Sequence, residues 1–183
     1  MLFGKEILIE NVAIGEPERL PTNFEMITSL GSNWFTNEML MRIPCREVHL
    51  RQERNEITAV SIDVLGALVK KWHEGAFVKL RYFSCCIFVR FVARNRVNVL
   101  NNVLQTILAG IPVMPREPND IPDNVRERAL LTENRVFIER TDGRCALLFI
   151  PVDTFKTFHF RVWIRNQQND KEDINDPLHQ WGT

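Results

Sequence analysis

Histidine and cysteine are the residue types in this sequence with the greatest capacity for catalysis or metal binding, and the chain has four of each. They are His49, His73, His159 and His179, and Cys45, Cys85, Cys86 and Cys145. No HExxH pattern places two zinc ligands on one helix face, and no CxxC spacing is present. Adjacent cysteines such as Cys85 and Cys86 rarely bond to each other, so we expect free and mostly buried thiols.

Catalysis finds little support in the remaining patterns. The sequence has no glycine-rich phosphate loop and no nucleophile elbow. Cys85 or Cys145 could act as a thiol nucleophile with a distant histidine, but their strand-like surroundings are more typical of buried, inert thiols. His73 falls in the last turn of a predicted helix, where an imidazolium interacts favourably with the helix dipole. We predict a binding or structural protein, not an enzyme, with no cofactor, metal or small-molecule substrate.

Basic charge is concentrated between residues 70 and 96, although the net charge of the whole chain is zero. Seven basic residues stand there against one acid, Glu74, which gives a local charge of +6. Such a segment attracts lipid headgroups or nucleic acid, so we predict a membrane-binding or nucleic-acid-binding patch. Its residues are Lys70, Lys71, Lys79, Arg81, Arg90, Arg94 and Arg96. Residues 1–30 and 166–183 each carry −3 and could pair with this segment in another copy. The alternative is a solvated face that the acidic ends of the same chain neutralise.

A capped helix over residues 60–75 presents the first of these lysines. Ser61 can cap the first free amides, Asp63 lies in the first turn, and Gly75 can end the helix in a left-handed conformation. Apolar residues recur at helical spacing and form a predicted buried face, which leaves Lys70 and Lys71 on the solvent side of the helix. It consists of Leu65, Leu68, Val69 and Trp72.

The segment after this helix, residues 77–92, is rich in β-branched and aromatic residues and predicts a strand, although its second half could be a buried helix. Lys79 and Arg81 share one face of such a strand. Residues 90, 94 and 96 share the opposite parity, so a single patch requires a turn or bulge near Ser84.

The remaining elements follow from local patterns. We predict strands at 5–13 and 155–165, an extended segment at 46–59, and a short helix at 22–31 with a Thr22–Glu25 capping box. The pattern of residues 97–110 predicts an amphipathic helix. Residues 111–124 contain four prolines and predict a long exposed loop, and residues 135–150 predict a hairpin around Asp142-Gly143.

Together these elements predict an α+β protein, with an antiparallel sheet and two or three amphipathic helices packed on it. We expect a single globular domain over 1–165 and a polar C-terminal tail over 166–183. No run of about 18 uncharged apolar residues is present, and the N-terminus lacks the layout of a signal peptide, which predicts residence on the cytosolic side of the membrane.

From Ser61 to Trp72 the chain follows the pattern S-x-D-V-x-x-A-x-V-x-x-W. With the strand before it, the second helix, the long loop and the antiparallel strands after it, this pattern resembles the globular core of rhabdovirus matrix proteins. The length suits the short matrix proteins of plant-infecting members, and the resemblance covers about residues 45–165.

The resemblance implies a viral structural protein that self-associates, binds the viral nucleocapsid or its RNA, and attaches to an anionic membrane surface. It would be found in the virion and in the host cytoplasm, at the membrane. In that family a loop after the central helices packs on a neighbouring molecule, and the matching residues here are Ile111, Val113 and Met114. The alternative is that these three fold back onto their own core. The family's basic N-terminal arm and PPxY motif have no counterpart here, so residues 70–96 would have to supply the basic function.

A second hypothesis is a plant-virus movement protein or RNA-silencing suppressor that binds single-stranded nucleic acid. Such a protein needs exposed aromatic rings among its basic residues for bases to stack on. The candidates are Tyr82, Phe83, Phe88 and Trp163, for which the alternative is burial in the core. Self-assembly would separate the two hypotheses, because a matrix protein polymerises, whereas a suppressor stops at a dimer.

Overall fold

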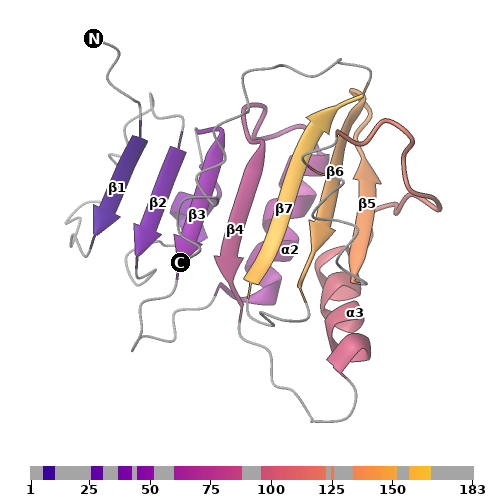
Figure 1. Ribbon diagram of the computed structural model, residues 1–183, viewed down its shortest axis with the longest axis horizontal. Helices are drawn as coiled ribbons and strands as arrows, with labels where there is room; N and C mark the ends of the chain where they lie inside the picture. The colour runs from indigo at the N-terminus through magenta and orange to yellow at the C-terminus, as the bar shows by residue number, and fades with distance from the viewer. Residues whose placement is uncertain are drawn as a thin grey trace.

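The structure, a computed structural model, describes residues 6–10, 26–30, 37–42, 45–51, 60–87, 96–122, 125, 134–151 and 157–165. Within these residues the helices are α1 (Asn37–Leu40), α2 (Ile62–His73) and α3 (Arg96–Ile107). The strands are β1 (Glu6–Glu10), β2 (Met26–Leu30), β3 (Glu47–Arg51), β4 (Tyr82–Cys86), β5 (Arg135–Glu139), β6 (Arg144–Phe149) and β7 (Thr157–Ile164). They form one mixed sheet in the order β1-β2-β3-β4-β7-β6-β5 (Figure 1).

The sheet has a parallel half and an antiparallel half. Strands β1 to β4 pair in parallel, whereas β4 pairs with β7, β7 with β6 and β6 with β5 in antiparallel fashion. Helices packed on a sheet agree with the α+β prediction, but a wholly antiparallel sheet was wrong. The reason is α2, which carries the chain back along the sheet so that β4 starts at the same end as β3. The turn at Asp142-Gly143, by contrast, joins β5 and β6 directly and makes them antiparallel.

The short helix predicted at 22–31 is also wrong, because residues 26–30 form β2. This strand lies between β1 and β3, with Ile27 opposite Ile7 on one side and Val48 on the other. Pairing on both edges outweighs a local capping signal, and the β-branched Ile27 and Thr28 suit a strand. The proposed capping residues at 22 and 25 lie outside the described residues.

The predicted strand at 77–92 is shorter than expected. Residues 76–81 form a turn, β4 covers Tyr82–Cys86, and residues 88–95 lie outside the described part of the chain. Strand β4 runs without interruption through Ser84, which is opposite His49 on one side and His159 on the other. The turn or bulge that a single basic patch required near Ser84 is therefore not present.

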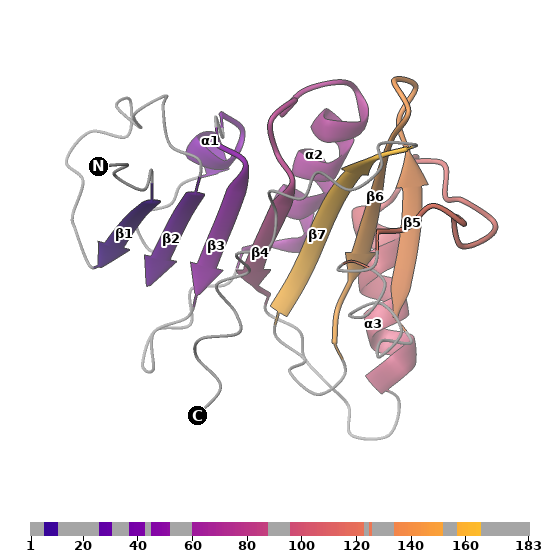
Figure 2. The same ribbon diagram turned by 45° about the horizontal axis from the view of Figure 1, so that its top comes forward.

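Helices α2 and α3 pack on one face of the sheet and form the main core with it (Figures 1 and 2). The Ser61 hydroxyl accepts a hydrogen bond from the Val64 amide, and Gly75 has the positive φ of 107° that ends the helix, as predicted. The predicted buried face of α2 is confirmed, and Trp72 meets Phe160 of β7 edge to face. The predicted second helix and the hairpin are confirmed as α3 and β5–β6.

A smaller apolar cluster lies on the opposite face of β5, β6 and β7. The segment after α3 contributes Ile121 and Val125 to it, and Met114 packs against it. The sheet contributes Phe137, Cys145, Leu147, Phe149 and Trp163. The segment predicted as an exposed loop is thus partly fixed to its own sheet. No helix in the described part of the chain is both long and apolar enough to cross a membrane.

Candidate functional site

Three lysines of the predicted basic patch gather where α2 ends. Lys70 and Lys71 lie in the last turn of α2, Lys79 lies in the turn that follows, and all three are exposed. We call this group the lysine end of α2. Arg81, half-buried, precedes β4 at the same end of the sheet.

The other basic residues are not brought into this group. Arg90, Arg94 and the side chain of Arg96 lie outside the described residues. Helix α3 begins at Arg96, and Figure 1 shows the start of α3 at the opposite end of the sheet from the end of α2. The length of β4 therefore separates Arg81 from the start of α3.

One acidic group near the lysine end, Asp142, is already paired with arginines. Arg140 donates to Asp142 at 2.7 Å, and Arg144 lies 3.7 Å from the same carboxylate. On the opposite face of the sheet, beside the smaller apolar cluster, Arg165 pairs with Glu139 at 2.8 Å and with Asp120 at 3.5 Å. Within the described residues, no ion pair involves the three lysines, and between positions 70 and 81 the one acid is Glu74. The three lysines outnumber Glu74, so the lysine end carries a net positive charge.

Arg46 joins this end of the sheet without any signal in the sequence. Its carbonyl oxygen accepts hydrogen bonds from the amides of Arg81 at 2.7 Å and Tyr82 at 3.1 Å. Its own side chain is half-buried. The pairing of β3 with β4 brings Arg46 beside Arg81, and this pairing cannot be read from either segment alone.

Two of the three predicted self-association residues pack within their own chain. Ile111 is buried in the main core, and Met114 packs on the smaller cluster, with its amide donating to the Phe137 carbonyl at 2.8 Å. Val113 remains 50% exposed and forms an isolated bridge with Ile138 of β5. Ile111 and Met114 thus fold back onto their own chain, which is the alternative that the sequence left open. Val113 remains the candidate for contact with a neighbouring molecule.

Three of the four aromatic residues considered for base stacking are buried. Tyr82, Phe83 and Trp163 are all buried, and Phe88 lies outside the described residues. Stacking on single-stranded nucleic acid requires an exposed ring face. These three residues therefore cannot serve as the stacking platform.

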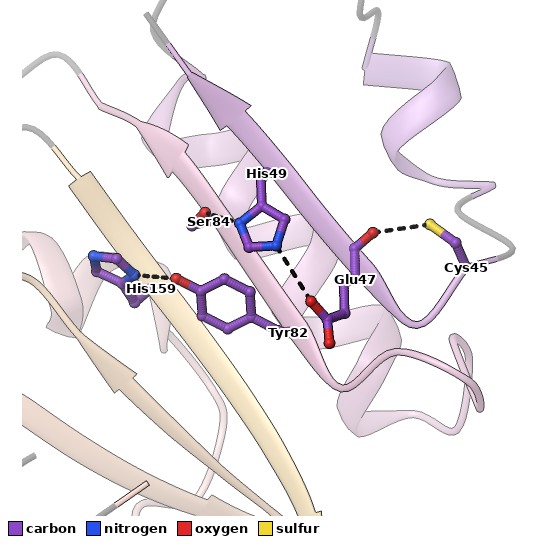
Figure 3. Close-up of polar contacts among 6 residues, drawn as sticks. All are labelled: Cys45, Glu47, His49, Tyr82, Ser84 and His159. Carbon is purple, nitrogen blue, oxygen red and sulfur yellow. Dashed lines mark hydrogen bonds and ion pairs between the residues drawn. The ribbon is translucent and has the colours of Figure 1, made fainter. Parts of the chain in front are cut away.

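A row of polar residues that the sequence did not reveal crosses the sheet on the face away from α2 (Figure 3). His49 of β3, Ser84 of β4 and His159 of β7 are in register, although they are far apart in sequence. Ser84 Oγ lies 3.4 Å from His49 Nδ1, and His49 Nε2 lies 3.3 Å from Glu47 Oε2. Tyr82 Oη lies 2.7 Å from His159 Nδ1. Only the register of three strands creates this row.

Serine, histidine and glutamate occur here in the order used to activate a nucleophile, but the geometry is unsuited to it. Ser84 is 8% exposed, and both its contact with His49 and the contact of His49 with Glu47 are long. A strand paired on both sides uses the backbone amides that an oxyanion hole would need. The row instead links three adjacent strands through side-chain hydrogen bonds.

Three of the four cysteines, Cys45, Cys85 and Cys145, are buried thiols. None of the four forms a disulfide, and Cys86 is the least buried of them. Burial raises the pKa of Cys45 to about 12 and that of Cys145 to about 11, and it raises the pKa of Cys85 well above the usual value. Since the thiolate is the nucleophile, Cys85 and Cys145 are poorly suited to the catalytic role considered from sequence. The described histidines, cysteines and carboxylates form no cluster that could hold a metal ion.

No family model, curated protein or solved structure matches this chain. The likeness to rhabdovirus matrix proteins accordingly stays a prediction that rests on the pattern from Ser61 to Trp72 and on the order of elements.

Proposed function

We propose that this protein is a matrix-type viral structural protein that self-associates and binds the nucleocapsid and an anionic membrane surface during virion assembly. The observation that supports this proposal best is the lysine end of α2. Three exposed lysines lie in the last turn of α2 and in the turn after it, against the single acid Glu74, while nearby Asp142 is already paired with Arg140. Such a surface fits a partner that presents many phosphates or anionic headgroups.

The free energy with which one lysine end can bind a membrane is small, and this explains why self-association belongs to the same function. Each lysine near an anionic bilayer contributes about 1 kcal/mol, so the three together contribute about 3 kcal/mol. That is less than the free energy of a millimolar complex, about 4 kcal/mol. One copy would bind only fleetingly, but an assembly that presents many lysine ends gains avidity. Membrane attachment and polymerisation are therefore coupled.

Val113 is the proposed contact for self-association. Its exposed side chain lies beside β5, the last strand of the described sheet on that side, where an apolar residue can meet a neighbouring molecule. The partners would be other copies of the chain and the viral ribonucleoprotein, in the virion and at the membrane in the host cytoplasm. The competing function, binding of single-stranded nucleic acid by stacking, is disfavoured by the burial of Tyr82, Phe83 and Trp163.

Sedimentation combined with light scattering tests the proposal, at about 0.05 M and 0.5 M salt, because the higher salt shortens the Debye length to a few ångström. We expect open-ended oligomers that grow with protein concentration at low salt and dissolve at high salt. A fixed monomer or dimer at both salts would contradict a matrix-type assembly.

Charge reversal then tests the lysine end. The double variant Lys70→Glu, Lys71→Glu is expected to lose binding to anionic vesicles. The matched control is Arg42→Glu with Arg116→Glu, which changes the net charge equally at two exposed arginines outside α2 and the turn that follows it. Equal loss in both variants would show that net charge, and not the lysine end, governs binding.

A further inference from the structure

We propose, on the basis of the function above, that the turn after α2 is a membrane-inserting tip that places Val78 in the apolar edge of an anionic bilayer. In this arrangement Lys70, Lys71 and Lys79 contact the lipid headgroups. The occupant of the lysine end is thereby specified as a lipid surface.

Val78 is the most exposed large apolar side chain in the described part of the chain, at 58%. Its neighbours in the turn anchor it from both sides. Phe77 packs against the main core, Leu80 is buried within it, and the Leu80 amide donates to the Phe77 carbonyl at 3.0 Å. Val78 and Lys79 are thus held at the corner of a closed turn and directed away from the core.

The backbone of this turn is strained. Phe77 has a φ of 54°, and within the described residues it is the one non-glycine residue with a positive φ. An aromatic residue rarely adopts this left-handed conformation, and such outliers persist where the surrounding structure enforces them, often at functional positions. Here the strained residue is the one that turns its own side chain inward and the next side chain outward.

Further contacts hold the turn rigid. The Ala76 amide donates to the Lys71 carbonyl at 2.9 Å, and Arg140 Nη1 donates to the Ala76 carbonyl at 3.1 Å. A tip that is already ordered loses little conformational entropy when it binds. The arrangement therefore favours insertion of a small preformed wedge over folding on contact.

An exposed valine among lysines distinguishes a bilayer from RNA. A valine side chain has no ring on which a base can stack and no group that can hydrogen-bond to a base. At a membrane interface, by contrast, burial of apolar area beside basic charge strengthens binding. RNA phosphates would use the lysines and leave Val78 without a role.

The test compares Val78→Ser with Val97→Ser, a change at a second exposed valine (37%) in the first turn of α3. Binding is measured by co-sedimentation with phosphatidylcholine vesicles containing about three parts in ten of phosphatidylserine. We expect Val78→Ser to weaken binding about three- to tenfold, as the loss of a half-exposed valine implies, and Val97→Ser to leave it unchanged. Circular dichroism confirms that both variants fold.

Single-stranded poly-uridylate provides the second arm. Val78→Ser should leave RNA binding unchanged, while Lys70→Glu with Lys71→Glu weakens it. Unaltered vesicle binding by Val78→Ser, or a wild-type protein that binds RNA but not vesicles, overturns the insertion proposal. Lipid-free sedimentation separates this failure from that of the matrix function. Absence of assembly removes the function, whereas normal assembly with a silent Val78→Ser change removes the inserting tip alone.

Discussion

The hydroxyl oxygen of Tyr82 lies 2.7 Å from Nδ1 of His159, a hydrogen bond between residues 77 positions apart. It joins β4 to β7, where the parallel half of the sheet meets the antiparallel half. His159 also stacks on Phe149, with ring centroids 4.6 Å apart, and Arg161 lies over the Tyr82 ring. This pair therefore extends the link between the two halves across β7 to β6.

Removal of the Tyr82 hydroxyl is expected to weaken this junction. Tyr82→Phe keeps the ring and its contact with Arg161, and should lower the free energy of unfolding by about 1 kcal/mol through loss of one buried hydrogen bond. Urea denaturation measures the change. Ser84→Ala is the comparison, because its 3.4 Å contact with His49 is much longer and should contribute less. Equal losses in the two variants would show that the short contact has no special weight.

Arg140 is expected to be among the most sensitive positions of the surface turns. It is buried, donates to Asp142 and to the Ala76 carbonyl, and lies 5.2 Å from the Trp72 ring centroid. Arg140→Ala should destabilise the fold by about 2 kcal/mol, since it removes a buried guanidinium that hydrogen-bonds the exposed Asp142 and the Ala76 carbonyl, and frees the turn after α2. The control Arg165→Ala removes a more exposed ion pair and should cost less than about 1 kcal/mol. Thermal and urea unfolding of the two variants decide this.

Replacement of glycine by alanine should have opposite effects on stability at Gly66 and Gly75, the two glycines of the α2 region. Gly75 has a φ of 107°, so alanine there is strained and should cost at least about 1 kcal/mol. Gly66 lies within α2, where an added Cβ would meet the Ile107 carbonyl oxygen at 3.4 Å, an ordinary contact. Gly66→Ala should be neutral or stabilising by up to about 1 kcal/mol, because alanine favours the helix. A loss at Gly66 comparable to that at Gly75 would mean that α2 and α3 cannot accept one methyl group between them.

Thiol reactivity should follow burial. Iodoacetamide at about pH 8 is expected to modify Cys86 before Cys45, Cys85 and Cys145, because burial raises the pKa of these three and keeps them protonated. Mass spectrometry of the folded protein gives the order. Equal reaction rates for Cys85 and Cys86 would show that the Cys85 side chain is not buried in β4.

The same pKa shifts make alkaline pH destabilising. Above the usual thiol pKa of 9.0 the unfolded chain loses these protons, while the folded protein keeps them up to about pH 11 or higher. The folded state then binds more protons than the unfolded state, so stability falls as pH rises through this range. Urea midpoints should decrease from about pH 9 upward, and Cys145→Ala should decrease less steeply than the wild type. An identical slope in the variant would exclude a contribution from Cys145.

Val113 and Met114 should differ although they are adjacent. Val113→Ser changes an exposed side chain and should weaken self-association with little effect on stability. Met114→Ser removes a side chain packed on the smaller cluster and should cost about 1 to 2 kcal/mol of stability. Light scattering and urea denaturation, measured on both variants, separate the two effects. Unchanged assembly in Val113→Ser would exclude this residue as the contact.

Local chemistry determined several elements before any tertiary contact is considered. The Ser61 cap, the apolar spacing from Leu65 to Trp72 and the stop at Gly75 together define α2, because each signal acts within one or two helical turns. The hairpin around Asp142-Gly143 and the alternation that buries Phe158 and Phe160 in β7 are equally short-range. The exposure of Lys70 and Lys71 follows directly from the helix face that Trp72 occupies.

Tertiary structure alone decided what depends on partners distant in sequence. Pairing with β1 and β3 made residues 26–30 a strand, and the return of the chain through α2 made β3 and β4 parallel. The same register aligned His49, Ser84 and His159, placed Arg46 beside Arg81, and turned Ile111 and Met114 onto their own core. A strand carries no local mark of which strand it will pair with, since pairing is fixed by backbone hydrogen bonds and burial across the sheet. For this reason the sequence determined the helix that carries the lysines, whereas the fold decided which basic residues stand beside them.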